Sequence, residues 1–180
     1  GLPELLFRFA CCPLTTQEQQ VAQMQDNIEL FKGQFWRINQ NISFGIPGYL
    51  FLQSLRDDVG CFSQLSTEEA AEMGVLLQRA STALESVLQP KLVLVGRYGL
   101  LPGHMIHFHL MPLFDELFDR YKERPEYQAF QRNNPQDYPA VPDAAELMAF
   151  AWREFCWQGK PLFDPPIEDV PKRLAEFLVA

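Results

Sequence analysis

The chain has 180 residues, of which 47% are hydrophobic and 13% aromatic, so it is long and apolar enough to fold around a sizeable core. Its formal net charge of −8 argues against binding to nucleic acid through a basic surface. No stretch of about 18 apolar residues occurs, so the sequence predicts no membrane span. The cysteines form no CxxC pair and predict reduced thiols in a cytoplasmic protein: Cys11, Cys12, Cys61 and Cys156.

Helix signals and two apolar runs organise the first part of the chain. Residues 15–33 predict a helix, because Thr15 and Glu18 fit a capping box and apolar residues then recur at helical spacing. Residues 34–38 and 48–53 are rich in aromatic and apolar side chains, and a turn-rich segment separates them. These two runs therefore predict a pair of strands.

A second helix and a second pair of strands follow. Residues 66–90 predict the clearest helix, which Ser66 and Glu69 would cap and which Pro90 would end. Residues 91–96 and 105–112 predict strands. The order helix, strand, strand, helix, strand, strand predicts an α+β fold, in which an antiparallel sheet carries helices on one face.

The sequence changes in character after the last of these strands. Residues 113–130 and 143–157 predict helices on either side of a loop rich in proline and asparagine, and a short helix follows near Pro171. We therefore expect a domain over residues 1–122 that includes the N-terminal helix. A helical C-terminal extension over residues 123–180 would dock on that domain.

All the histidines of the chain lie between His104 and His109. Successive side chains of a strand point to opposite faces, so one face would carry Ile106, Phe108 and Leu110, and the other Met105, His107, His109 and Met111. The apolar face predicts the core side. Two imidazoles on the opposite face can bind a metal ion, act in phosphoryl chemistry, or fill polar positions without a function. The metal interpretation lacks further ligands on this strand.

The stretch MIHFHLMP resembles the signature strand of the histidine triad (HIT) superfamily, in which three histidines alternate with apolar residues. Met105, His107 and His109 occupy the triad positions. The upstream order of elements is also similar to this family, including the turn at Pro47 and Gly48, and the resemblance covers residues 28–114. The segment that follows is similar to a C-terminal extension of one bacterial HIT-like hydrolase subgroup. A HIT-like fold and, by family expectation, a homodimer are implied.

The resemblance implies that His107 attacks the α-phosphorus of a purine nucleotide or dinucleotide, and that water then hydrolyses the nucleotidyl-histidine. His109 would donate to a phosphate oxygen. The residues expected to bind the substrate are Asn41, Arg97, Gly103, His104, Met105 and Trp36. The resemblance implies no required cofactor and no metal ligand. A divalent ion that accompanies a polyphosphate could lie near the acidic residues Asp115, Glu116 and Asp119.

Three departures from the family pattern leave alternatives open. Met105 replaces the first histidine of the triad, and Tyr49 replaces the histidine that usually follows the PG turn. The loop before the triad strand has none of the glutamine and hydroxyl residues that usually hold the phosphate. The leading prediction is a HIT-type hydrolase or transferase, and the alternative is a nucleotide-binding protein with little or no turnover. A metalloprotein that uses the histidines and a cysteine is a third interpretation.

Overall fold

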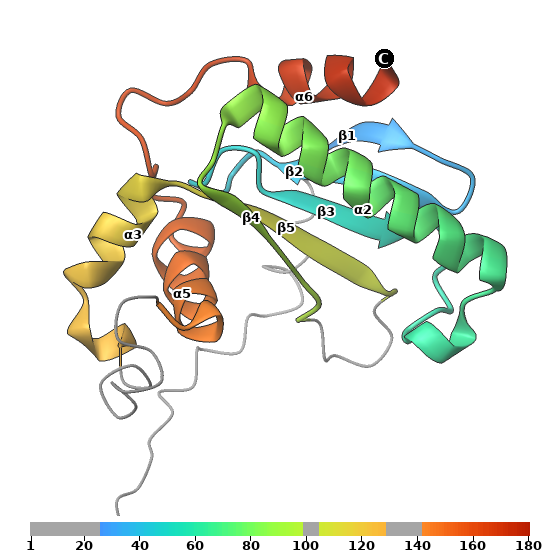
Figure 1. The fold of residues 1–180 in the computed structure, drawn as a ribbon, viewed down its shortest axis with the longest axis horizontal. Helices are drawn as coiled ribbons and strands as arrows, with labels where there is room; N and C mark the ends of the chain where they lie inside the picture. Colours follow the sequence, from blue (N-terminus) through green and yellow to red (C-terminus); the bar gives the residue numbers. More distant parts are fainter. Residues whose placement is uncertain (1–25, 99–104, 129–141) are drawn as a thin grey trace, which may run out of the picture.

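A five-stranded antiparallel sheet with the order β1-β2-β3-β5-β4 forms the centre of the computed structural model, which describes residues 26–98, 105–128 and 142–180 (Figure 1). The strands are β1 (Asn27–Lys32), β2 (Trp36–Asn41), β3 (Leu50–Ser54), β4 (Leu92–Gly96) and β5 (His107–Leu113). The helices are α2 (Thr67–Leu88), α3 (Asp115–Lys122), α5 (Ala144–Ala151) and α6 (Val170–Val179). Short helical turns lie at Phe62–Gln64, Pro125–Tyr127 and Trp152–Trp157, the last of which continues α5. The predicted α+β class with a long helix on an antiparallel sheet is confirmed.

One predicted helix is wrong where it can be compared. Residues 27–32 form the edge strand β1, whereas the earlier part of the predicted helix lies outside the described residues. The register of β1 against β2 shifts between Glu29 and Phe31, which explains why the apolar residues of this strand are spaced as in a helix. Leu30 is buried in the core and Phe31 packs against the same core, so the strand departs from simple alternation and imitates a helical period.

The long helix α2 and the C-terminal helix α6 lie together on one face of the sheet (Figure 1). The N-terminus of α2 has the predicted capping box, because the Ser66 side chain accepts from the backbone of Glu69 while the Glu69 carboxylate accepts from the backbone of Ser66. Its buried face consists of Leu76, Ala80, Ala83 and Leu84, which pack on the sheet. This side is the main apolar core.

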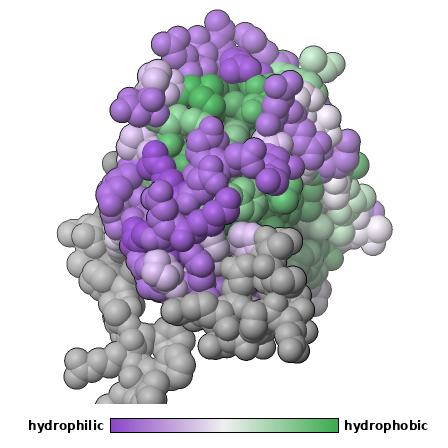
Figure 2. Space-filling model, turned by 60° about the vertical axis from the view of Figure 1, so that its left-hand side comes forward, coloured by the Kyte–Doolittle hydropathy of each residue, from purple (hydrophilic) through white to green (hydrophobic). Residues whose placement is uncertain are grey.

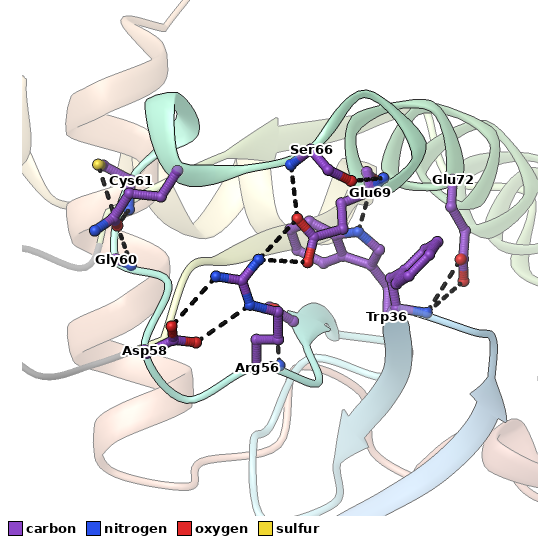
Figure 3. Close-up of polar contacts among 11 residues, drawn as sticks. Trp36, Arg56, Asp58, Gly60, Cys61, Ser66, Glu69 and Glu72 are labelled. Carbon is purple, nitrogen blue, oxygen red and sulfur yellow. Dashed lines mark hydrogen bonds and ion pairs between the residues drawn. The ribbon is translucent and has the colours of Figure 1, made fainter.

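Glu69 joins the start of α2 to the sheet and to the loop after β3 (Figure 3). Its carboxylate accepts from the Ser66 amide at 2.7 Å, and its two oxygens both accept from Arg56 Nη1, at 3.0 and 3.1 Å. Its backbone carbonyl accepts from the Trp36 indole at 2.8 Å. The Ser66 amide, followed by Arg56, lowers the pKa of Glu69, so the carboxylate stays charged and keeps these contacts.

The opposite face of the sheet is also covered, which corrects the expectation that helices lie on one face. Tyr49 and Met111 of this face belong to a second apolar cluster, together with α3, α5 and the turn after α5. Figure 2 views the molecule from the side where α3 and the segment before α6 lie, and shows hydrophobic surface framed by hydrophilic residues. The helix α5 and the turn after it therefore pack on this second face of the sheet.

No helix among the described residues is both long and apolar enough to cross a membrane. Two of the cysteines expected to be reduced lie in the described parts of the chain, and both are free thiols. Cys61 is exposed, whereas Cys156 is buried and its pKa is raised by that burial. The other two, Cys11 and Cys12, lie outside the described residues.

Trp36 is a core residue, so its replacement should lower the stability of the protein. We expect Trp36→Phe to lower the free energy of unfolding by about 1–3 kcal/mol, because the Glu69 carbonyl loses its indole donor and the smaller ring leaves unfilled space. Urea denaturation measures this, with Phe177→Leu as a control at a site that is 39% exposed. A variant of unchanged stability would contradict the core assignment.

Candidate functional site

The histidine pair lies on the face of the sheet opposite α2. Directly opposed residues of neighbouring strands share a face, and His107 pairs with Gln53 while His109 pairs with Phe51. Phe108 between them points into the core with Leu52. The alternation predicted for this strand is therefore present, and the two imidazole ring centres lie 5.0 Å apart.

A backbone contact favours the tautomer of His107 that nucleophilic attack requires. Its Nδ1 lies 3.1 Å from the carbonyl oxygen of Met105. A carbonyl only accepts hydrogen bonds, so this contact favours the tautomer with the proton on Nδ1, in which Nε2 carries the lone pair. The side chain is half-buried. The backbone at the first triad position thus orients the imidazole although that residue is a methionine.

His109 is packed deeply beside its neighbour and is only 6% exposed. Burial, followed by the nearby His107, lowers its pKa to about 3, so the ring is neutral near pH 7. Its Nδ1 lies 3.0 Å from the hydroxyl of Tyr49, whose pKa burial raises well above its ordinary value. When that hydroxyl donates to Nδ1, the proton of the ring is on Nε2, which becomes a neutral hydrogen-bond donor.

Aromatic side chains surround His109 and include one from the C-terminal region. The rings of Phe51, Tyr49 and Tyr98 lie with their centres 4.9–5.9 Å from it. Trp152, just after α5, has its ring centre 5.9 Å away. The C-terminal region therefore contributes to this face through an aromatic ring. Two cations of this region have other partners, because Arg153 lies over Tyr127 and Lys160 approaches Glu154.

A polar chain that sequence reasoning missed leads across the sheet to Met105. Arg37 Nε and Asn39 Nδ2 both donate to Gln53 Oε1, at 3.0 and 3.2 Å. Gln53 Nε2 in turn donates to the Met105 sulfur at 2.9 Å. The sequence offers one signal for these residues, the polar side chains at alternating positions 37, 39 and 41 of WRINQN. Which of these side chains lies in line with His107 depends on the register between the strands.

The other predicted substrate-binding residues that the structure describes are engaged with partners other than His107. Trp36 is fully buried on the α2 face, which corrects its assignment to the substrate-binding residues. Arg97 directs its guanidinium to the carbonyl of Gly60. Asn41 is on the histidine face but buried, and its Oδ1 accepts from the backbone and hydroxyl of Ser43 in the turn after β2. Gly103 and His104 lie outside the described residues.

The acidic residues after β5 form ion pairs rather than a cluster. Asp115 lies 2.9 Å from Lys91, and Asp119 lies 2.9 Å from Lys122. Within the described residues, no three histidine, cysteine, aspartate or glutamate side chains come together as a metal site would need. The geometry around Asp115, Glu116 and Asp119 thus offers no support for a divalent ion there.

A separate hollow of about 280 Å³ lies between the β2–β3 connection and the segment that leads to α6. It is lined by apolar residues such as Phe44, Phe163 and Ile167 and by several prolines. Gln40 also lines it, and its buried Oε1 has no hydrogen-bond partner among the residues that the structure describes. No charged side chain lines this hollow, so it is poorly suited to a phosphate, and the histidine face is the better candidate for chemistry on one.

Comparison with known proteins supports the fold. No family model and no curated protein matches the chain. A hypothetical histidine triad nucleotide-binding protein from Sulfolobus tokodaii superposes with a TM-score of 0.50 over 88% of this chain and 88% of its own, at 9% identity. A histidine triad protein from Bradyrhizobium japonicum gives a TM-score of 0.44 at 17% identity over 56% of this chain and 70% of its own. A HIT-like protein involved in cell-cycle regulation from Bartonella henselae gives 0.44 at 13% identity, over 54% of this chain and 78% of its own. The chain has the histidine triad fold.

The burial of His109 predicts a particular loss of stability in acid. In the unfolded chain this histidine takes up a proton near pH 6.5, whereas in the folded protein it does so only near pH 3. Acid therefore favours unfolding between these two pH values. From pH 6.5 to 5 this costs about 2 kcal/mol.

His109→Gln removes the titrating group, so its free energy of unfolding should fall less steeply over this range. Chemical denaturation of both proteins at several pH values measures the two slopes, whatever the absolute stability of the variant. Equal slopes would show that His109 is not held neutral in the folded protein.

Proposed function

We propose that the chain is a member of the HIT superfamily that acts on a nucleotide α-phosphate through a nucleotidyl-histidine at His107. The observation that carries the proposal is the contact between His107 Nδ1 and the Met105 carbonyl, because it favours the tautomer in which Nε2 carries the lone pair, on a side chain that is half-buried. The Sulfolobus tokodaii protein with the same fold is described as nucleotide-binding, which supports a nucleotide as the ligand.

Each residue of the site has a defined part in the reaction. The lone pair of His107 Nε2 attacks the α-phosphorus, a new N–P bond forms, and the bond to the leaving group breaks with its electrons on the departing atom. A water molecule then attacks the same phosphorus, the N–P bond breaks, and free His107 and a nucleoside monophosphate result. When its proton is on Nε2, His109 donates to a non-bridging phosphate oxygen as charge develops there.

Met105 restricts which leaving groups the site can expel from the α-phosphorus. A thioether has no proton to give, so the residue at the first triad position cannot protonate the departing group. Leaving groups that are stable as anions, such as phosphates, need no such proton, whereas an amine does. An enzyme built on this site should therefore favour leaving groups of low pKa unless another side chain supplies an acid.

The alternative is a nucleotide-binding protein with little or no turnover. Two observations favour it, namely the methionine at the first triad position and the close aromatic packing that buries His109. In such a protein both imidazoles would still contact the phosphate, but the adduct would not form or would not be hydrolysed.

Intact mass spectrometry separates the two. Wild-type protein is mixed briefly with diadenosine tetraphosphate and, separately, with an adenosine phosphoramidate, beside His107→Asn. We expect a gain of one nucleotidyl group in the wild type alone, because asparagine cannot attack phosphorus. Bound nucleotide without an adduct or product would support the binding protein instead, and an adduct in His107→Asn would move the nucleophile to another residue.

We also propose a homodimer formed through the exposed edge strand β4 and the neighbouring face of α2. Leu92 and Val95 on β4 are 44% and 41% exposed, and Val75 on α2 is 57% exposed. Unpaired strand edges with apolar side chains favour association. Light scattering coupled to gel filtration should show a dimer for the wild type and a monomer for Val95→Glu; a monomeric wild type at high micromolar concentration would contradict the proposal.

A further inference from the structure

One cross-strand row of the sheet leads from His107 to two cations. His107 lies directly opposite Gln53, Gln53 opposite Arg37, and Arg37 opposite Lys32, so these four residues share the histidine face across β5, β3, β2 and β1. Neighbouring strands are about 4.8 Å apart, which places the Arg37 backbone about 10 Å and the Lys32 backbone about 14 Å from that of His107. We call Lys32 and Arg37 the cationic pair.

The cationic pair has no carboxylate partner within the described residues, unlike several other cations of this acidic chain. Lys32 is exposed and Arg37 is half-buried. The acid nearest in register on this face is Glu29, which lies opposite Asn39 in the adjacent row and makes no ion pair with either cation. Two like charges on adjacent strands repel each other, so their placement costs stability unless an anion joins them.

Hydrogen bonds hold Arg37 ready for such an anion. Its Nε donates to Gln53 Oε1, which also accepts from Asn39, while Gln53 Nε2 is engaged with the Met105 sulfur. The amide of Gln53 is thereby fixed in one orientation, and it fixes the base of the guanidinium. The terminal nitrogens of Arg37 make no hydrogen bond to any described residue, and such a fork matches the oxygens of a phosphate or carboxylate.

We propose that the cationic pair is an anion-binding subsite that holds the charged part of the substrate next to the phosphate attacked by His107. The inference rests on the proposed function and deepens it. The ligand class is a nucleotide whose leaving group carries further phosphates, because an anion spread along this row meets Arg37 first and Lys32 beyond it. The same subsite stabilises the departing phosphate as the P–O bond breaks, which compensates for the missing proton donor at Met105.

The kinetic test compares two leaving groups in matched variants. Diadenosine tetraphosphate has a phosphate leaving group, and an adenosine phosphoramidate has a neutral amine. We expect Arg37→Gln to lower kcat/KM for the tetraphosphate about 10- to 100-fold, as the loss of a charge-assisted contact does, and to change the phosphoramidate less than threefold. Lys32→Gln should give a smaller loss in the same direction, and Arg37→Lys should recover part of the activity because it keeps the charge.

One further variant and a fold check serve as controls for this comparison. Lys172→Gln removes an exposed cation from α6 and should leave both substrates unaffected. Thermal unfolding of every variant shows whether the sheet is intact. Equal losses on both substrates, or no loss on either, would overturn the subsite; an equal loss in Lys172→Gln would show that overall charge rather than this row is responsible.

A binding experiment tests the same subsite without catalytic turnover. Titration calorimetry with inorganic tripolyphosphate at low salt should show binding to the wild type that weakens at least tenfold in Arg37→Gln and fades as salt is added. If no nucleotidyl adduct forms at His107 while this pattern holds, the hydrolase fails and the subsite stands. Binding that is equal in wild type and Arg37→Gln would overturn the subsite, whatever the activity shows.

Discussion

The alternation of side chains along β5 is the constraint on which the rest of this structure depends. A single strand gives Phe108 and Leu110 to the core under α2 and gives His107 and His109 to the opposite face. A slip of one residue would bury the imidazoles under α2 and expose the core. The neighbours β3 and β4 pair with it on both sides, so the register of the functional strand is fixed by the packing of the whole sheet.

Short-range signals in the sequence were sufficient for most of the fold. The capping box at Ser66, the strands around residues 92–96 and 107–113, and the antiparallel class all follow from patterns within about 25 residues. The strand β1 did not, because its irregularity beside Leu30 depends on pairing with β2, which no local pattern reveals. Coverage of the second face by α5 was missed for the same reason, since it depends on how two distant segments pack.

The candidate site shows the same division between local and long-range information. The relation of His107 to His109 could be predicted from spacing alone, because both lie on one strand. Gln53 and Arg37 could not, since their approach to Met105 requires the registers of three strands at once. Trp36 was misplaced because an aromatic residue on an early strand fits either a ligand pocket or a core, and only its bond to Glu69 decides between them.

The position of Trp152 gives this protein a natural optical reporter. Its ring lies beside His109, whereas Trp36 is sealed in the core and hydrogen-bonded to a backbone carbonyl. An anion that settles on the histidine face changes the electric field at the first indole and leaves the second almost untouched. Once the third tryptophan, Trp157, is replaced by phenylalanine, changes in emission can be assigned to one side of the sheet without any label, with the spectrum of the buried indole as an internal reference.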